Sequence, residues 1–228
     1  MANFRTHLSV AAVVSGGLAT VGVHFKLFGL TTALLCAIIG TIGGLLPDID
    51  LEHSEPARRG FFLGSLIASM LITILYANSY RQDELILHSL IVWALSFVVI
   101  RFGVIELFCR LTVHRGMVHS VPYMAVFGLL VVHGVFYGLQ MTTFVSWVFG
   151  VFLFIGSLVH LLLDEIYSVN ALGLRLKQSA GTAFKFVELK KPLQYLVLYA
   201  VAAGLFFTAP SHQEVWRLVV RQMGMVLK

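Results

Sequence analysis

The sequence has little charge and little cysteine. Only 12% of its 228 residues are Asp, Glu, Lys or Arg, and 58% are hydrophobic, whereas a soluble domain has about 25% charged and about 45–50% apolar residues. This shortage of charge excludes an ordinary soluble domain and indicates a polytopic membrane protein. The two cysteines, Cys36 and Cys109, lie in or beside apolar segments, and their spacing fits neither a disulfide framework nor a zinc ribbon.

Several familiar site signatures are also missing from the sequence. It contains no His-Glu-x-x-His, no Gly-x-Ser-x-Gly and no P-loop. Its formal net charge of +5 is modest and spread over the loops, which favours membrane orientation and contact with anionic lipid over nucleic-acid binding. We therefore expect membrane lipid as a partner and no nucleic acid, and the oligomeric state stays open.

Seven apolar segments are long enough, or nearly so, to cross the hydrocarbon core of a bilayer, which takes roughly 20 residues. No stretch between them could hold a soluble domain. We therefore predict an all-α fold, a polytopic membrane helical bundle of about seven spans that forms a single domain over residues 1–228. The predicted spans are Leu8–Phe25, Phe28–Leu46, Phe61–Ala77, Leu85–Phe108, Val121–Leu139, Phe144–Leu163 and Pro192–Thr208.

The end of the chain has a different pattern, in which apolar residues recur at helical spacing among polar ones. A helix with one apolar face and one polar face lies in the membrane surface instead of crossing the bilayer. We predict such an interfacial amphipathic helix over residues 212–228. Its apolar face would consist of Trp216, Val219, Val220, Met223 and Leu227.

A polar pair lies near the end of the sixth predicted span, in SLVHLLLDEIY. His160 and Asp164 are four residues apart, so on a helix both side chains lie on one face about one turn apart. Such a pair can chelate one ion, and imidazole with carboxylate suits zinc, manganese or iron. Each side chain is costly to bury in hydrocarbon unless it is paired or ligated. The alternative is a polar pair that hydrogen-bonds neighbouring helices.

Two carboxylates follow the second predicted span, in LLPDID. Pro47 ends or kinks the helix, so Asp48 and Asp50 are not bound to helical geometry and could converge. They could hold or bridge metal ions, or one could act as a general base on a metal-bound water. Alternatively, they only solubilise the end of a helix.

Two histidines and an arginine precede the fifth predicted span, in HRGMVHS. The glycine between His114 and His119 permits a turn, and Ser120 is the expected N-cap of the next helix, with Pro122 in its first turn. His119 would then lie at a helix start, where the dipole favours anions. Arg115 is suited to a phosphate or a carboxylate. The alternative is a pair of interfacial histidines with an arginine that contacts lipid headgroups.

Threading the seven spans through a bilayer brings all of these clusters to one membrane side, together with His7 at the start of the first span. His7 on its own could equally be an ordinary interfacial histidine. The loops and ends on that side carry about twice as many Lys and Arg residues as those on the other side, which places it in the cytoplasm. The side chains that share this side are His7, Asp48, Asp50, His114, His119, His160 and Asp164.

With these residues in place, the chain resembles the YdjM-like family of predicted membrane-bound metal-dependent hydrolases. The resemblance runs over most of the chain and rests on Thr6-His7, LLPDID, HRGMVHS and His160-x-x-x-Asp164. It implies a divalent-metal site and hydrolysis at the membrane. The family is also distantly similar to zinc-dependent phospholipase C and its nuclease relatives, which cleave phosphodiesters. The metal ligands that the resemblance implies are His7, Asp48, His114, His119, His160 and Asp164.

We therefore expect a membrane-bound metal-dependent hydrolase that acts on a phosphate-containing or lipid-like substrate through a metal-activated water. The expected cofactor is a divalent metal, with zinc as the first choice. Asp50 and Arg115 are the expected catalytic residues. One of the two carboxylates, Asp48 or Asp50, would act as the base, and Arg115 would stabilise developing negative charge. The expected location is the bacterial inner membrane, with the site facing the cytoplasm. The alternatives are a divalent-metal transporter or sensor without hydrolytic activity, and a structural protein whose polar clusters only pack helices.

Overall fold

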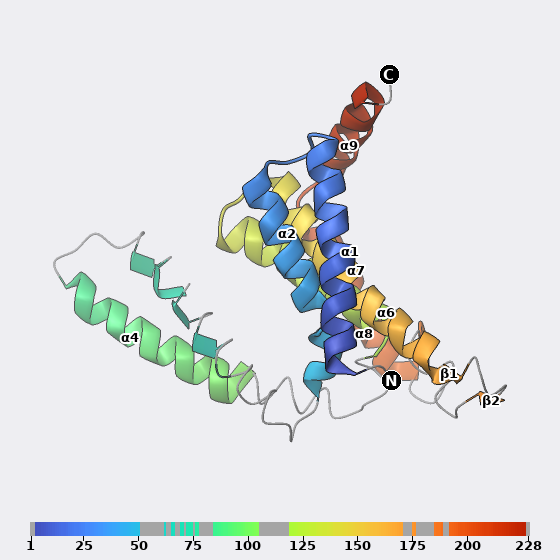
Figure 1. The fold of residues 1–228 in the computed structure, drawn as a ribbon. Coiled ribbons are helices and arrows are strands. Elements are labelled where there is room, and N and C mark those ends of the chain that lie inside the picture. Colours follow the sequence, from blue (N-terminus) through green and yellow to red (C-terminus); the bar gives the residue numbers. More distant parts are fainter. Residues whose placement is uncertain are drawn as a thin grey trace. The chain divides into compact units, whose positions relative to one another are not determined.

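The computed structural model describes residues 3–50, 84–104, 119–170 and 192–226, with short pieces at 62, 65–66, 69–70, 72–74, 76–77, 175–176 and 185–188. Within this part the fold is almost entirely helical, as the all-α prediction expects (Figure 1). Contacts divide the chain into two compact units, Met1–Pro47 with Gly116–Lys228, and Asp48–Arg115. The single domain over residues 1–228 stays a prediction.

The helices of the first unit follow the predicted spans closely. A short antiparallel pair, β1 (Val169–Asn170) with β2 (Arg175–Leu176), follows the end of the helix α7 (Thr143–Ser168). The second unit contains α4 (Leu85–Val98), which continues into the π-helix η2 (Val99–Val104). The helices of the first unit are α1 (Phe4–His24), α2 (Leu30–Gly43), α6 (Val121–His133) with the π-helix η3 (Gly134–Gly138), α7 (Thr143–Ser168), α8 (Pro192–Thr208) and α9 (Gln213–Val226).

The number of long apolar helices agrees broadly with the predicted seven spans. The described residues contain five helices that could cross a membrane, or six if the bent pair α8 and α9 counts as one span. The helix α8 coincides with the predicted seventh span. Only scattered residues of the predicted third span, Phe61–Ala77, are described, and these are helical.

The helix α7 is the central element of the first unit, since it packs against α1, α2 and α6. Glycines allow the closest approaches. A Cβ added at Gly156 of α7 would collide with the main-chain carbonyl of Gly40 in α2, and one added at Gly150 would lie 2.6 Å from the carbonyl oxygen of Gly128 in α6. Small residues permit such backbone-to-backbone contact between helices in lipid. The main apolar cluster lies between these helices and consists of Ala19, Ala33, Cys36, Val135, Phe149 and Phe152.

The second helix ends earlier than predicted. It ends at Gly43, not at Leu46, and the 3-10 helix η1 (Leu46–Asp50) follows after a short turn. Pro47 therefore lies inside a 3-10 helix and does not itself end α2. The glycines at this end are packed against α7, because a Cβ added at Gly43 would collide with the carbonyl of Leu153.

The helices α8 and α9 meet at a bend of 73°. The corner is held by α7, because the indole Nε1 of Trp147 donates a hydrogen bond to the carbonyl oxygen of Pro210 at 2.8 Å. Along α9, Val215 and Val219 are half-buried, whereas Trp216 and Val220 are exposed. A helix is thus present where the amphipathic pattern predicted one, and its place on the membrane surface stays a prediction.

Spin labels on α9 test this place. In a variant without cysteine (Cys36→Ala, Cys109→Ser), a label at Val220→Cys should be accessible to oxygen but not to a polar nickel complex, because its face would meet the acyl chains. A label at Arg221→Cys, which lies about 140° around the helix from Trp216, should show the reverse. Electron paramagnetic resonance of the protein in liposomes measures both accessibilities. Equal exposure of the two labels to the nickel complex would contradict an interfacial helix.

Candidate metal centre

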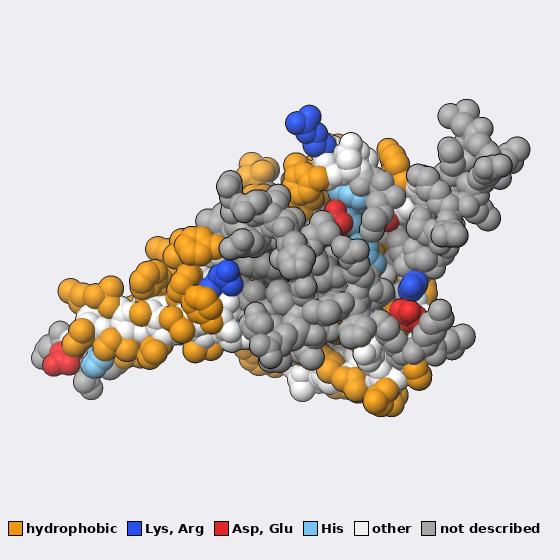
Figure 2. All heavy atoms as spheres, turned by 90° about the horizontal axis from the view of Figure 1, so that it is seen from below, with side chains coloured by type: hydrophobic (Ala, Val, Ile, Leu, Met, Phe, Trp, Pro, Cys, Tyr) orange, Lys and Arg blue, Asp and Glu red, His pale blue; other side chains and the backbone are white. Residues whose placement is uncertain are grey.

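Four of the predicted ligands meet at one end of the first unit. His7 lies near the start of α1, His119 directly before α6, and His160 with Asp164 near the end of α7, at the end of the bundle where the N-terminus lies (Figure 1). Seen from below, this end shows histidine and acidic side chains together (Figure 2). Three segments that are distant in sequence therefore place three imidazoles and a carboxylate side by side.

Asp164 is the residue that the three histidines share. Its Oδ1 lies 3.3 Å from Nε2 of His7, and its Oδ2 lies 3.7 Å from Nε2 of His160 and 4.0 Å from Nε2 of His119. All three distances exceed those of ordinary hydrogen bonds, which are about 2.7–3.2 Å. Asp164 is 3% exposed, so its carboxylate is removed from water and needs compensation close by.

The orientation of His160 is fixed by the backbone of α2. Its Nδ1 lies 2.8 Å from the carbonyl oxygen of Gly44. Because a carbonyl only accepts, Nδ1 carries the proton and donates, which leaves Nε2 as the nitrogen that offers a lone pair in neutral imidazole. A hydrogen bond of this kind, from the second ring nitrogen to a backbone carbonyl, typically orients a metal-binding histidine.

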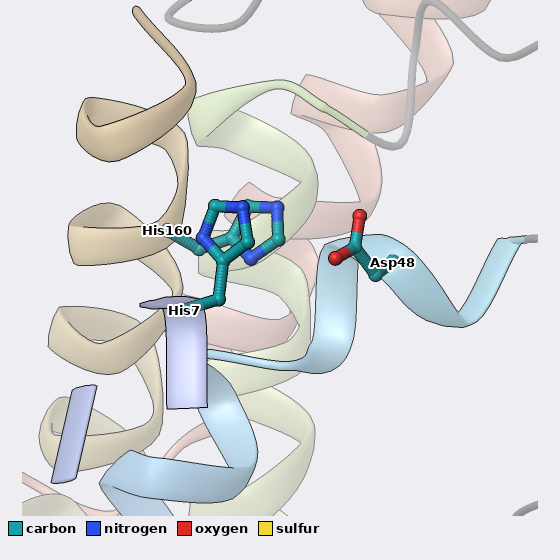
Figure 3. Close-up of side chains that lie close together, drawn as sticks. All are labelled: His7, Asp48 and His160. Atoms are coloured by element: carbon teal, nitrogen blue, oxygen red, sulfur yellow. The ribbon is translucent and has the colours of Figure 1, made fainter. Parts of the chain in front are cut away.

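His7 lies directly against His160. The two rings are stacked, with centroids 3.7 Å apart and an interplanar angle of 15°, and Figure 3 shows one ring in front of the other. His7 is 1% exposed, and its Nδ1 has no hydrogen-bond partner within the described part of the chain. A buried nitrogen in this condition is costly unless an ion or a water completes it.

Asp48 lies in η1 and is bonded to Pro47, the last residue of the first unit's opening segment. One of its carboxylate oxygens and one ring nitrogen each of His7 and His160 lie within 4.8 Å of one another (Figure 3). A second group with the same spacing consists of His119, His160 and Asp164. His160 belongs to both groups, so the two potential ligand sets are contiguous.

The donor set fits a divalent metal. Nε2 of His160 and Oδ2 of Asp164 are both acceptors when the imidazole is neutral, so a proton or a cation between them would make their approach favourable. Ligands of a tetrahedral zinc with bonds of about 2.0–2.1 Å lie roughly 3.3–3.5 Å apart. The separations from the carboxylate oxygens of Asp164, 3.3–4.0 Å, are near that spacing. Imidazole with carboxylate is also the chemistry that zinc, manganese and iron accept.

Three predicted site residues are not placed by the structure. His114 and Arg115 lie outside the described residues, as does the side chain of Asp50. The start of α6 agrees with the prediction, since Ser120 is its N-cap and a proline lies in its first turn. The amide of Val121 donates to the carbonyl oxygen of Lys185 at 2.9 Å, so the backbone of Lys185 contacts the first residue of α6.

Sequence reasoning missed two residues that organise the site. Gly44 supplies the carbonyl that orients His160, and the hydroxyl of Ser157 donates to the carbonyl of Gly43 at 3.0 Å. The signal was a pair of glycines just before LLPDID and a serine three residues before His160. A main-chain acceptor has no side-chain signature, so the pairing itself was not visible in the sequence.

A family model described as "YdjM inner membrane protein" matches residues 1–176. The chain belongs to this family. The matched YdjM region contains His7, His119, His160 and Asp164, and it ends before α8. Membership confirms the resemblance found in the sequence and identifies an inner membrane protein, although the family's description states neither an activity nor a metal. No curated protein matches the chain, and neither does any solved structure.

Metal content tests the ligand assignment. Protein extracted in mild detergent should carry stoichiometric divalent metal, zinc first, by elemental analysis. His160→Ala and Asp164→Ala should each remove nearly all of it, because the loss of one ligand leaves the other donors too few and poorly oriented.

His24→Ala is the matched control, since this histidine lies exposed in the last turn of α1, away from the cluster. It should bind as much metal as the wild-type protein. A wild-type protein that holds no stoichiometric metal, with retained helicity by circular dichroism, would contradict the assignment.

Proposed function

We propose that this YdjM-family protein is a membrane-bound metal-dependent hydrolase that acts on a phosphate-containing or lipid-like substrate. The observation that carries the proposal is the approach of Nε2 of His160 to the buried carboxylate of Asp164, with Nδ1 of the same ring committed to Gly44. Buried charge in a membrane protein is costly and marks functional sites. A divalent cation at this point would be coordinated by both groups.

The chain's own residues would hold the ion and orient it. His7, His119, His160 and Asp164 supply the donors that lie together, with Asp48 beside them, and we extend the set to His114 from the sequence. A bound divalent ion there supplies Lewis-acid chemistry, activating water towards a pKa of about 7 and polarising a phosphoryl oxygen. Asp50 is proposed as the base that accepts a proton, and Arg115 as the cation that stabilises charge on the substrate.

A phosphorylated lipid is the substrate class that this location favours. The cluster lies at the ends of apolar helices, so it would lie near the depth of lipid headgroups in a bilayer. The excess of Lys and Arg in the loops on this side supports a cytoplasmic orientation. A headgroup phosphate on that leaflet would reach the ion without leaving the membrane.

The same ligands would also serve a divalent-metal transporter or sensor. One observation favours transport: Ser15 is buried on the face of α1 that carries His7, about two turns deeper in the bundle, and its hydroxyl has no hydrogen-bond partner among the described residues. However, Ala11 and Ala19 are the other buried neighbours on that face, and an ion path needs polar groups throughout. Hydrolysis therefore fits better.

Turnover tests the proposal directly. Zinc-loaded protein should hydrolyse bis-p-nitrophenyl phosphate, p-nitrophenyl phosphate or phosphatidic acid in vesicles, followed as nitrophenolate or inorganic phosphate. Asp164→Ala should lower the rate by more than about 100-fold, because it removes a ligand and not merely a supporting contact. His24→Ala should keep the wild-type rate.

Uptake separates the two candidates. Proteoliposomes containing the wild-type protein should not accumulate zinc above protein-free liposomes. Zinc accumulation that Asp164→Ala abolishes, together with no hydrolysis of the three phosphate probes, would overturn the hydrolase in favour of a transporter.

A further inference from the structure

The helices α2 and α7 touch through their main chains next to the histidine cluster. A Cβ added at Gly156 of α7 would collide with the carbonyl oxygen of Gly40 and lie 3.0 Å from the amide nitrogen of Gly44. At Gly44, an added Cβ would collide with the side chain of Ala11 and lie 3.4 Å from the carbonyl oxygen of Gly156. The absence of side chains at this contact thus sets how near the two helices come.

Two hydrogen bonds from α7 to α2 depend on this approach. They start from Ser157, the neighbour of Gly156, and from His160, one turn further on. The hydroxyl of Ser157 lies 3.0 Å from the carbonyl oxygen of Gly43 and equally far from that of Leu153 in its own helix, so it donates to the two in a shared bond. Nδ1 of His160 donates to Gly44 at 2.8 Å. Hydrogen bonds weaken beyond about 3.2 Å, so moving α2 away by roughly 1 Å would break both.

We infer that Gly156 is a positioning residue for the metal centre. The close contact of Gly156 with α2 keeps the carbonyl of Gly44 within hydrogen-bond distance of His160. This carbonyl accepts the proton on Nδ1 of His160, which leaves Nε2 facing Asp164 as a ligand. The inference rests on the proposed metal site. Support for a ligand at this place comes separately from His7, whose buried Nδ1 has no hydrogen-bond partner in the described part of the chain.

The bundle contains a matched contact that lacks this role. Gly150, also on α7, packs closely against α6, since an added Cβ would lie 2.5 Å from Cγ2 of Val132 and 2.6 Å from the carbonyl oxygen of Gly128. It precedes His160 by ten residues, or about 15 Å along the helix. Gly204 of α8 offers a second comparison, because an added Cβ there would meet nothing within 4 Å.

The test measures zinc affinity by competition with a fluorescent chelator in the full-length protein. Gly156→Ala should weaken zinc binding by about 10–100-fold, the range typical of lost support behind a ligand. Gly150→Ala should also lower Tm and yet keep the zinc affinity within about twofold of wild type. Gly204→Ala should change neither property.

The tautomer of His160 is a second measurement, and it would not change if Gly156 only stabilised the fold. In metal-free protein labelled with ¹⁵N-histidine, and with the signal assigned through His160→Ala, wild type and Gly150→Ala should show a protonated Nδ1. Gly156→Ala should show a mixture of tautomers. If Gly156→Ala does not fold, Ser157→Ala takes its place, since it removes one of the two bonds without adding volume, and it should weaken zinc binding severalfold.

The outcomes separate this inference from the proposed function. Equal zinc affinity in Gly156→Ala and wild type would overturn the inference alone, as would equal losses in Gly156→Ala and Gly150→Ala. For the replacement variant, wild-type affinity in Ser157→Ala would overturn it. A wild-type protein that binds no zinc would overturn the proposed function, and the inference with it.

Discussion

The structure depends on the burial of one carboxylate. Asp164 is almost completely removed from solvent at the end of an apolar helix, and an isolated charge in such a place carries a penalty of several kcal/mol. Three imidazoles surround it, one each from α1, from the start of α6 and from α7 itself. The three imidazoles can surround Asp164 only if the ends of α1, α6 and α7 that carry them lie together in the bundle.

Backbone contact makes this convergence possible. Side chains of ordinary size hold packed helices about 8–10 Å apart, which would leave His160 without its backbone acceptor. The glycines along α2 and α7 let the two helices come closer than this. The carbonyl of Gly44 can then accept a hydrogen bond from a ring nitrogen of His160. The lack of side chains at these glycines thus explains both the close packing of α2 against α7 and the orientation of the His160 ring.

The sequence predicted the helices and much of the cluster, because both leave side-chain patterns. Apolar runs predicted α1, α6, α7 and α8 to within a few residues, and threading brought His7, His119, His160 and Asp164 to one side. It did not predict where α2 ends, since that depends on how glycines fit a partner helix. It also missed Gly44, because a carbonyl acts as an acceptor in every residue type and only three-dimensional proximity selects one.

The hydrogen bond between Val121 and Lys185 links a segment outside the family's matched region to the helix start near His119. Residues 185–188 lie beyond the region that the family model matches, yet their first carbonyl is bonded to the helix that begins directly after His119. The side chains of Phe186 and Val187 are about half exposed. Replacements in this segment would therefore act on the helix start that follows His119, and not on the ring nitrogens and the carboxylate themselves.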